Sequence, residues 1–81
     1  MVNIKDAVAL RILELCEKNN ITINKLSTIC GITQSTINNI VRGGSRNPTV
    51  STVKKICDGL GMSLSEFFYA KVFENLEQEV K

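Results

Sequence analysis

Histidine is absent from this 81-residue chain, and proline occurs only once. Without histidine the chain lacks the commonest general base, and neither paired carboxylates nor a phosphate-holding glycine loop accompanies its basic region. Its serines and cysteines therefore have no neighbouring base to activate them as nucleophiles. These absences argue against an enzyme, and we expect no catalytic residue and no cofactor.

The cysteine pattern does not suit a disulfide framework or a metal site. Cys16, Cys30 and Cys57 are odd in number and lack a C-x-x-C spacing. Without histidine, a zinc site would need unusual ligands. Each cysteine falls on an apolar helical face, where a free thiol acts as a small hydrophobic side chain. We predict three buried free thiols and no metal.

Long hydrophobic runs are also missing. No apolar stretch approaches the roughly 20 residues of a membrane span, and Lys5, Asp6 and Arg11 interrupt any candidate signal peptide. The chain is 43% hydrophobic, which is ordinary for a globular protein and argues against disorder. We expect one cytoplasmic domain, with no membrane partner and no evident small-molecule ligand.

Acidic residues are missing from the stretch between Lys18 and Lys55. Six basic residues occupy that stretch: Lys18, Lys25, Arg42, Arg46, Lys54 and Lys55. From Asp58 onward, five acidic residues accompany only Lys71 and Lys81. The formal net charge of +2 therefore understates how strongly the charges are segregated. A merely solvated surface would mix both signs, so the pattern favours a nucleic-acid-binding region.

Residues 22–43, within this basic stretch, predict two short helices joined by a tight turn. Thr22 and Thr33 can each cap a helix by accepting a hydrogen bond from one of its first backbone N–H groups. Gly31 stands where the chain must reverse, and Gly43 ends the second helix. The inward positions recur at three- and four-residue spacing: Leu26, Ile29 and Cys30, then Ile37, Ile40 and Val41.

The spacing around the turn is that of a DNA-binding helix-turn-helix. Ser27 lies four residues before Gly31, and its small side chain lets the two helices approach closely. Ile37 lies six residues after Gly31, and Ile32 is expected to fill the space between the helices.

Three further helices are predicted around this pair. After a flexible lead-in over residues 1–5, the first runs to about Lys18. The next follows a turn-rich loop that contains Pro48, begins at the cap Thr49 and ends at Gly59 or Gly61. The last begins at a capping box over residues 63–66. Their expected inward residues are Val8, Ile12, Leu15 and Cys16; Val50, Val53, Ile56 and Cys57; and Leu64, Phe67 and Phe68.

The ordered set of motifs resembles the five-helix domain of the Cro and lambda-repressor-like (XRE-type) family of bacterial and phage regulators, over some three quarters of the chain. The matching pieces are Leu26-Ser27, residues 30–37, Arg42-Gly43, Asn47-Pro48-Thr49 and residues 60–64. The resemblance implies an all-α, lambda-repressor-like domain that binds double-stranded DNA as a transcriptional regulator. It also implies a homodimer, a repressor role, and operator recognition by the helix after the glycine.

The sequence departs from the family pattern at two places. Ile23 stands where the family often has a glutamine that contacts DNA phosphate or neighbouring side chains. Near Cys16 and Val41 the family often carries arginine and glutamate, which would form a buried ion pair; here both positions are apolar. Replacing such a pair with hydrophobic residues is often neutral or stabilising.

Candidate DNA contacts lie opposite the inward stripe of the helix expected over about residues 34–42. The base-reading candidates, on its first turns, are Gln34, Ser35 and Asn38. Gln34 and Asn38 carry amides that can pair with an adenine edge. Candidates for the DNA backbone are Thr22, Ile23, Lys25, Thr33, Asn39, Arg42, Arg46 and Asn47. The alternative is that these polar residues only solvate an exposed helix.

Residues 1–69 are assigned to the DNA-binding domain, and residues 70–81 to a helical C-terminal extension. No glycine or proline follows Met62, so the last helix is expected to continue or a sixth to begin. Apolar residues recur at helical spacing: Tyr69, Val72, Phe73, Leu76 and Val80. This stripe is interpreted as a dimerisation surface. The alternative is that Val72 and Phe73 pack on the first helix.

A second function class remains compatible with the same fold. The domain could have lost its DNA contacts and serve as a protein-interaction module or an antitoxin. A DNA binder would show affinity that falls steeply with salt, and a protein-interaction module would not.

Overall fold

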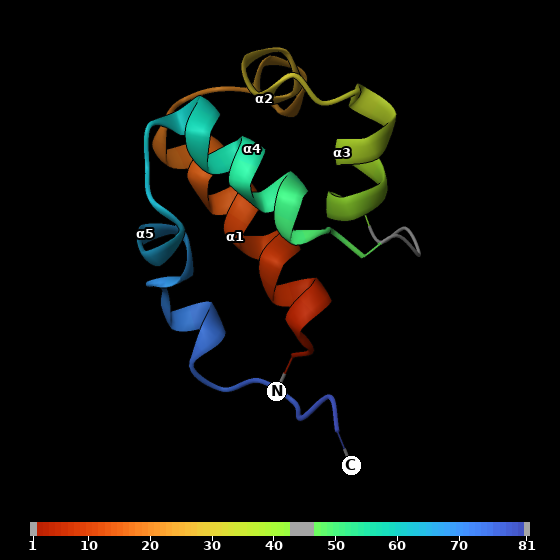
Figure 1. The fold of residues 1–81 in the computed structure, drawn as a ribbon, viewed down its shortest axis with the longest axis vertical. Helices are drawn as coiled ribbons and strands as arrows, with labels where there is room; N and C mark the ends of the chain where they lie inside the picture. The colour runs from red at the N-terminus through yellow and green to blue at the C-terminus, as the bar shows by residue number, and fades with distance from the viewer. Residues whose placement is uncertain (1, 43–46, 81) are drawn as a thin grey trace.

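The computed structural model describes residues 2–42 and 47–80 (Figure 1). The described chain is all-α apart from an isolated bridge between Val2 and Leu76. Its elements are α1 (Ile4–Lys18), α2 (Ile23–Cys30), α3 (Gln34–Val41), α4 (Val50–Leu60), α5 (Leu64–Phe68) and the 3-10 helix η1 (Lys71–Phe73). The predicted all-α architecture with five α-helices is confirmed.

Each α-helix begins at a residue whose side chain accepts a hydrogen bond from the first turn. Four of these caps were predicted: Thr22, Thr33, Thr49 and Ser63, the last in a complete capping box with Glu66. The fifth is Asn3, whose Oδ1 accepts from the backbone N–H of Asp6 at 2.8 Å. The lead-in was therefore wrongly expected to be flexible up to residue 5, because α1 already begins at Ile4.

Helix ends also follow from local chemistry. Gly31 and Gly61 end α2 and α4 in the left-handed conformation, at φ 67° and 68°. As predicted, α1 ends at Lys18. The last residue of α3 is Val41, with Arg42 as its C-cap. The stop expected at Gly43 lies outside the described residues.

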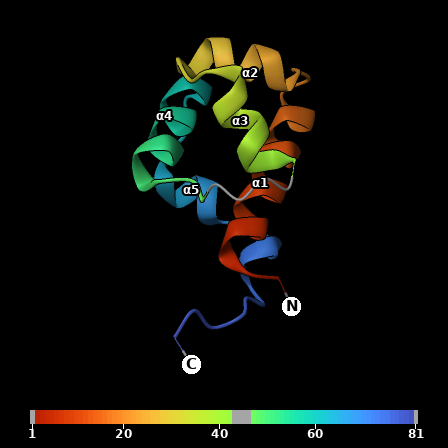
Figure 2. The same ribbon diagram turned by 90° about the vertical axis from the view of Figure 1, so that its right-hand side faces the viewer.

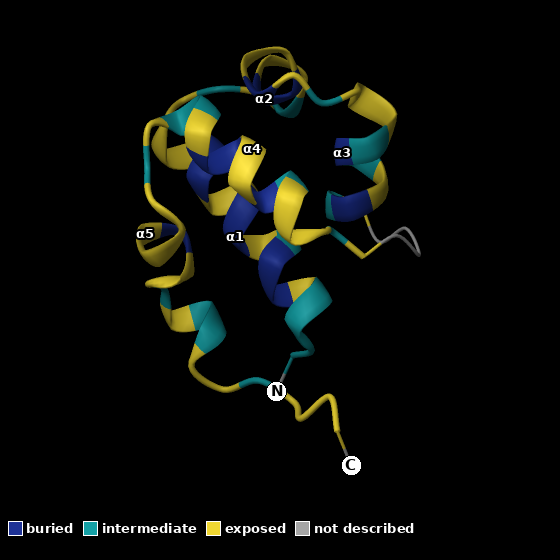
Figure 3. Cartoon of the chain, in the orientation of Figure 1, coloured by how far each residue is buried: buried dark blue, intermediate teal, exposed yellow. Residues whose placement is uncertain are grey.

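All five α-helices contribute to one core, shown in dark blue in Figure 3. Its fully buried large side chains are Ile12, Leu26, Ile37, Ile40, Ile56, Cys57 and Phe67. Cys16, Cys30 and Cys57 are all buried and free, as predicted. Burial raises the pKa of each of these thiols, so they remain protonated hydrophobic groups at neutral pH.

Four residues predicted to face inward are exposed instead. Val50 is 76% exposed, and the others are Ile29, Leu64 and Phe68, at 39%, 37% and 42%. Helical spacing selects a face more than 100° wide, but in a domain this small only the centre of that face is covered. Val50 is the first residue of α4, where little of the chain lies over it.

The C-terminal segment does not form the helical extension that the sequence predicted. Beyond Phe68 the described chain contains a single turn of 3-10 helix, η1, and then runs irregularly to Val80. The ring of Phe73 lies 5.0 Å from that of Phe68 and 6.2 Å from that of Phe67. The backbone N–H of Glu77 donates to the Val2 carbonyl at 2.9 Å. A continued α5 would carry these groups away from the core, so the chain folds back and η1 packs on α1.

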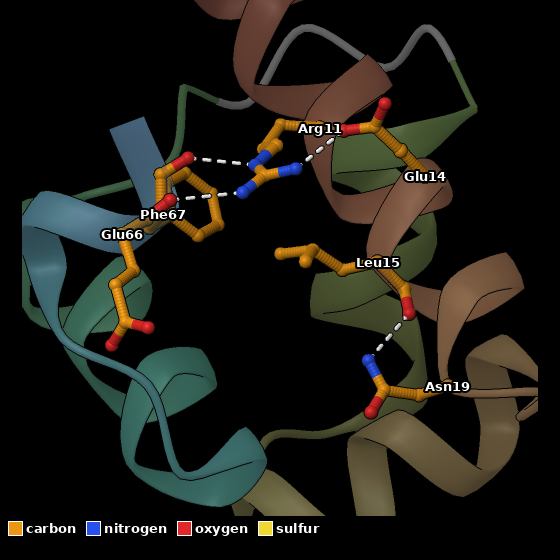
Figure 4. A network of polar contacts seen from close by, with 6 residues as sticks. All are labelled: Arg11, Glu14, Leu15, Asn19, Glu66 and Phe67. Carbon is orange, nitrogen blue, oxygen red and sulfur yellow. Dashed lines mark hydrogen bonds and ion pairs between the residues drawn. The ribbon is translucent and has the colours of Figure 1, made fainter. Parts of the chain in front are cut away.

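Arg11 is buried although it is charged, with 5% of its surface exposed. Its Nε donates to the Phe67 carbonyl at 2.7 Å and its Nη2 to the Glu66 carbonyl at 2.9 Å, while Nη1 pairs with the Glu14 carboxylate (Figure 4). The guanidinium group thus donates to two backbone carbonyls near the C-terminus of α5, of which that of Glu66 also accepts from the Tyr69 N–H. This contact ties α1 to α5.

Candidate nucleic-acid interface

The turn between α2 and α3 fixes the relative position of the two helices. Ser27 is buried at the end of α2, and its carbonyl accepts from the Gly31 and Ile32 backbone N–H groups. Its hydroxyl donates back to the Asn24 carbonyl at 2.8 Å, so no polar group of this small side chain is left unsatisfied against α3. The two helices pack directly on each other, as the sequence spacing predicted.

One face of α3 is anchored in the core and the opposite face is open. Ile37 and Ile40 are fully buried, and Val41 is half-buried against the core. Figure 2 shows α3 at the front of the molecule with its outer side uncovered, and Figure 1 places α3 and α5 on opposite sides of α1 and α4. The α5 and η1 helices therefore lie away from this open face.

The three residues predicted to read bases lie on that open side of α3. Gln34 and Ser35 are exposed in its first turn. Asn38 follows Gln34 by one helical turn and is half-buried. Because residues four apart in a helix are neighbours, the Gln34 and Asn38 amides form a short polar row along the surface.

The side chain of Arg42 bonds to that of Asn38. Arg42 Nε donates to Asn38 Oδ1 at 2.9 Å. Sequence reasoning assigned Arg42 only to the DNA backbone and missed this contact. The i, i+4 spacing of a long donor and a short amide on a helix was the signal that could have found it.

The predicted phosphate contacts divide into two structural groups. Asn39, Arg42, Lys25 and Asn47 have exposed side chains. Thr22 and Thr33 are exposed, but each hydroxyl accepts from the backbone of its own helix, from Lys25 N–H and Thr36 N–H respectively. Ile23 is half-buried and packs against the core, so only its backbone is suited to an anion. Arg46 lies outside the described residues.

The basic surface is less uniform than the sequence suggested. Lys54 pairs with Asp58 one turn later on α4, and this hydrogen bond raises the lysine pKa. Asp58, the first acidic residue after the acid-free stretch, therefore offsets the positive charge of Lys54. Lys25 lies in α2 and Arg42 is the C-cap of α3, so both belong to the helix-turn-helix.

Comparison with known protein families agrees with this geometry. The family model described as Helix-turn-helix matches residues 12–67, which is most of the chain. The chain belongs to the helix-turn-helix family. The match runs from α1 through Phe67 and so includes α2, α3 and the turn between them. At the family level, the protein is an XRE-type, DNA-binding regulator.

A solved structure shares both the fold and part of the sequence. The crystal structure of prophage Lp1 protein 11 is 34% identical to this chain, with a TM-score of 0.80. The aligned region covers 94% of this chain and all of that chain. The similarity therefore extends past the residues of the family match and into the C-terminal segment. The search of curated proteins found no match.

Two further searches covered the described residues. No helix among them is long and apolar enough to cross a membrane. Within residues 2–42 and 47–80, no group of three or more His, Cys, Asp or Glu side chains is arranged to hold a metal ion.

Proposed function

We propose that the protein is a transcriptional repressor that binds a specific double-stranded DNA sequence by inserting α3 into the major groove. The observation that carries this proposal is the division of α3 into two faces. Ile37 and Ile40 anchor one face, and Gln34, Ser35 and Asn38 lie on the other. A major groove admits one helix, and amides and hydroxyls on its first turns can reach base edges.

Phosphate contacts on both sides of the groove would hold α3 in register. The N-terminus of α2, with Thr22 and the exposed Lys25, would meet one strand. Asn39, Arg42 and Asn47 follow the base-reading residues and would meet the other, with Thr33, Ile23 and Arg46 as further candidates. Phosphate contacts of this kind position the protein, and base contacts specify the sequence.

Salt dependence tests DNA binding most simply. Affinity for duplex DNA is expected to fall steeply with salt, and Lys25→Ala should flatten the slope of log K against log salt by roughly 1. Lys71→Ala, an exposed change on η1 away from α3, is the matched control and should leave the slope unchanged. Affinity that is independent of salt would contradict the proposal and favour a protein-interaction module or antitoxin.

We further propose that the repressor acts as a two-fold homodimer joined on the α5 side. A single domain makes few base contacts, and doubling them requires recognition helices about 34 Å apart. Tyr69 is 89% exposed beside the exposed Phe68 and Leu64, which line an apolar hollow with Val50 and Val53. Val80 is also exposed, whereas Val72, Phe73 and Leu76 are half-buried, so Tyr69 is the stronger candidate among the five predicted residues.

Sedimentation tests the dimer. Tyr69→Glu should convert the dimer to a monomer at micromolar concentration, because it places a charge in an apolar contact. Lys18→Glu, an exposed change at the end of α1, should not. A wild-type chain that is monomeric at high micromolar concentration would contradict a dimer.

A further inference from the structure

We infer that Arg42 positions the side chain of Asn38 so that it selects adenine, in addition to contacting phosphate. The inference rests on the proposed insertion of α3 into the major groove. It assigns Arg42 a part in sequence choice that a simple phosphate contact would not have.

Two hydrogen bonds join Arg42 to Asn38, and the first of them holds the Asn38 side chain. Arg42 Nε donates to the side-chain Oδ1 at 2.9 Å, and the Arg42 backbone N–H donates to the Asn38 carbonyl at 2.9 Å. Asn38 is also half-buried, whereas Gln34 and Ser35 are exposed. Its side chain is therefore more restricted than those of the other two base-reading candidates.

The bond from Arg42 fixes which end of the amide accepts and which donates. Nε carries a hydrogen and has no acceptor function, so it can bond only to the oxygen of the amide and not to its NH₂ group. A rotation that exchanges Oδ1 and Nδ2 would break the contact. One lone pair of Oδ1 and both hydrogens of Nδ2 remain available to a base.

That fixed order matches adenine better than the other bases. In the major groove adenine offers the N6 amino group as donor beside the N7 acceptor, which pair with Oδ1 and Nδ2 together. Guanine offers only acceptors on its edge, thymine offers one acceptor and a methyl group, and cytosine offers a single donor that can meet Oδ1 but leaves Nδ2 without an acceptor. A rotated amide could give its NH₂ group to guanine O6 or thymine O4. Holding the amide in one orientation therefore removes the contacts through which those bases would be tolerated.

Arg42 keeps its terminal nitrogens for DNA in this arrangement. The contact to Asn38 uses Nε, which leaves Nη1 and Nη2 for a phosphate oxygen. Arginine can make both contacts because its donors form a planar fork. Lysine at the same position keeps the charge, but its three donors share one nitrogen and lack the planar fork that lets Nε meet Asn38 while Nη1 and Nη2 meet a phosphate.

The experiment compares sequences selected from a random duplex pool by four proteins: wild type, Asn38→Ala, Arg42→Lys and Arg42→Ala. In the wild type, one base pair per half-site should be adenine, preferred by about 5-fold to 100-fold as for a bidentate pair. Asn38→Ala should remove that preference. Arg42→Lys should reduce it at least several-fold, with guanine and thymine gaining, while the slope of log K against log salt stays as in the wild type.

Arg42→Ala should lose the same preference and also flatten the salt slope by roughly 1. The double variant Asn38→Ala/Arg42→Lys should show no loss of sequence preference beyond that of Asn38→Ala. Because Arg42 is exposed, its variants should keep the wild-type melting temperature, which excludes a general loss of folding.

Three results would overturn the inference while leaving the proposed function standing: full adenine preference in Arg42→Lys, additive losses in the double variant, or an unchanged selected sequence in Asn38→Ala. A wild type that binds duplex DNA without enriching any sequence would overturn both this inference and the sequence-specific function. The two failures are distinguished by the wild-type pool alone.

Discussion

At the scale of single residues, Arg11 joins α1 to α5 through three contacts of one guanidinium group. In the sequence it interrupts an apolar helix and reads as a surface charge. It nevertheless lies three residues after Val8 and four before Leu15, and so within the buried stripe of α1. That spacing could have indicated an inward position, but Arg11 was not among the residues predicted to face inward. Its partners are carbonyls some 55 residues away, which no local pattern reveals.

Arg11→Ala should lower the free energy of unfolding by about 2–3 kcal/mol, because it removes two charge-assisted bonds and takes the donor from the buried Phe67 carbonyl. Glu14→Ala is the matched control. The Glu14 side chain is 47% exposed, and exposed ion pairs contribute at most about 1 kcal/mol. Urea unfolding of both variants measures the difference. Equal losses would mean that the bonds from Arg11 to α5 do not stabilise the fold.

The burial of the Cys30 thiol predicts that the free energy of unfolding depends on pH. Its pKa is raised from the ordinary 9.0, first by burial and then by Cys16 and Cys57. The unfolded chain therefore loses this proton at lower pH than the folded chain. The stabilisation that comes from this difference is fully present below the pKa of Cys30 in the unfolded chain. It is lost as the pH rises through the pKa of Cys30 in the folded chain. Urea unfolding between pH 7 and pH 10 should show a shallower decline in Cys30→Ala than in the wild type. If the free energy of unfolding falls equally with pH in both proteins, the Cys30 thiol does not contribute to the pH dependence.

At the scale of elements, α2 and α4 approach each other closely at Gly59. A Cβ added at Gly59 would lie 2.6 Å from Cys30 Sγ and 3.2 Å from Cys30 Cα. Glycine normally weakens a helix interior, so its presence in α4 is explained by the close packing of α2. The sequence analysis considered Gly59 only as a helix end and missed this role.

Gly59→Ala should therefore destabilise the protein by about 1–2 kcal/mol, although alanine favours the helix itself by up to about 1 kcal/mol. Adding Cys30→Ala removes the sulfur atom and should recover part of the loss. Chemical unfolding of the two single variants and the double variant gives the coupling between them. A Gly59→Ala variant that is more stable than the wild type would refute this account of the α2–α4 contact.

The sequence predicted the helices better than their exposed faces or the C-terminal segment. Caps such as Thr33 and Ser63 bond within their own first turn, so nearby residues reveal them. The position of Phe73 depends instead on Phe67 and Phe68 and on the pairing of Val2 with Leu76. Apolar spacing over residues 69–80 suits a helix, but these longer-range contacts determine the structure.

At the scale of the whole molecule, the surface proposed to bind DNA and the surface proposed for dimerisation lie on different sides. The open face of α3 and the α5 side are separated by α1 and α4 (Figure 1). The residues proposed for dimerisation therefore do not overlap those proposed to contact DNA. The division into faces on α3 was predictable from the spacing of Ile37 and Ile40. The bond between Arg42 and Asn38 was not identified from the sequence, because it depends on the rotamers of two exposed or half-exposed side chains.

The most direct test of the central claim is the sequence selected by Gln34→Ala. The wild type should enrich a palindromic site from a random duplex pool, with half-sites about one helical turn apart. Gln34→Ala should lose preference at one base pair in each half-site and bind the wild-type site about 1–3 kcal/mol more weakly. Ser65→Ala, exposed on α5, should select the wild-type sequence. If Gln34→Ala also selects the wild-type sequence, α3 does not read DNA through this face.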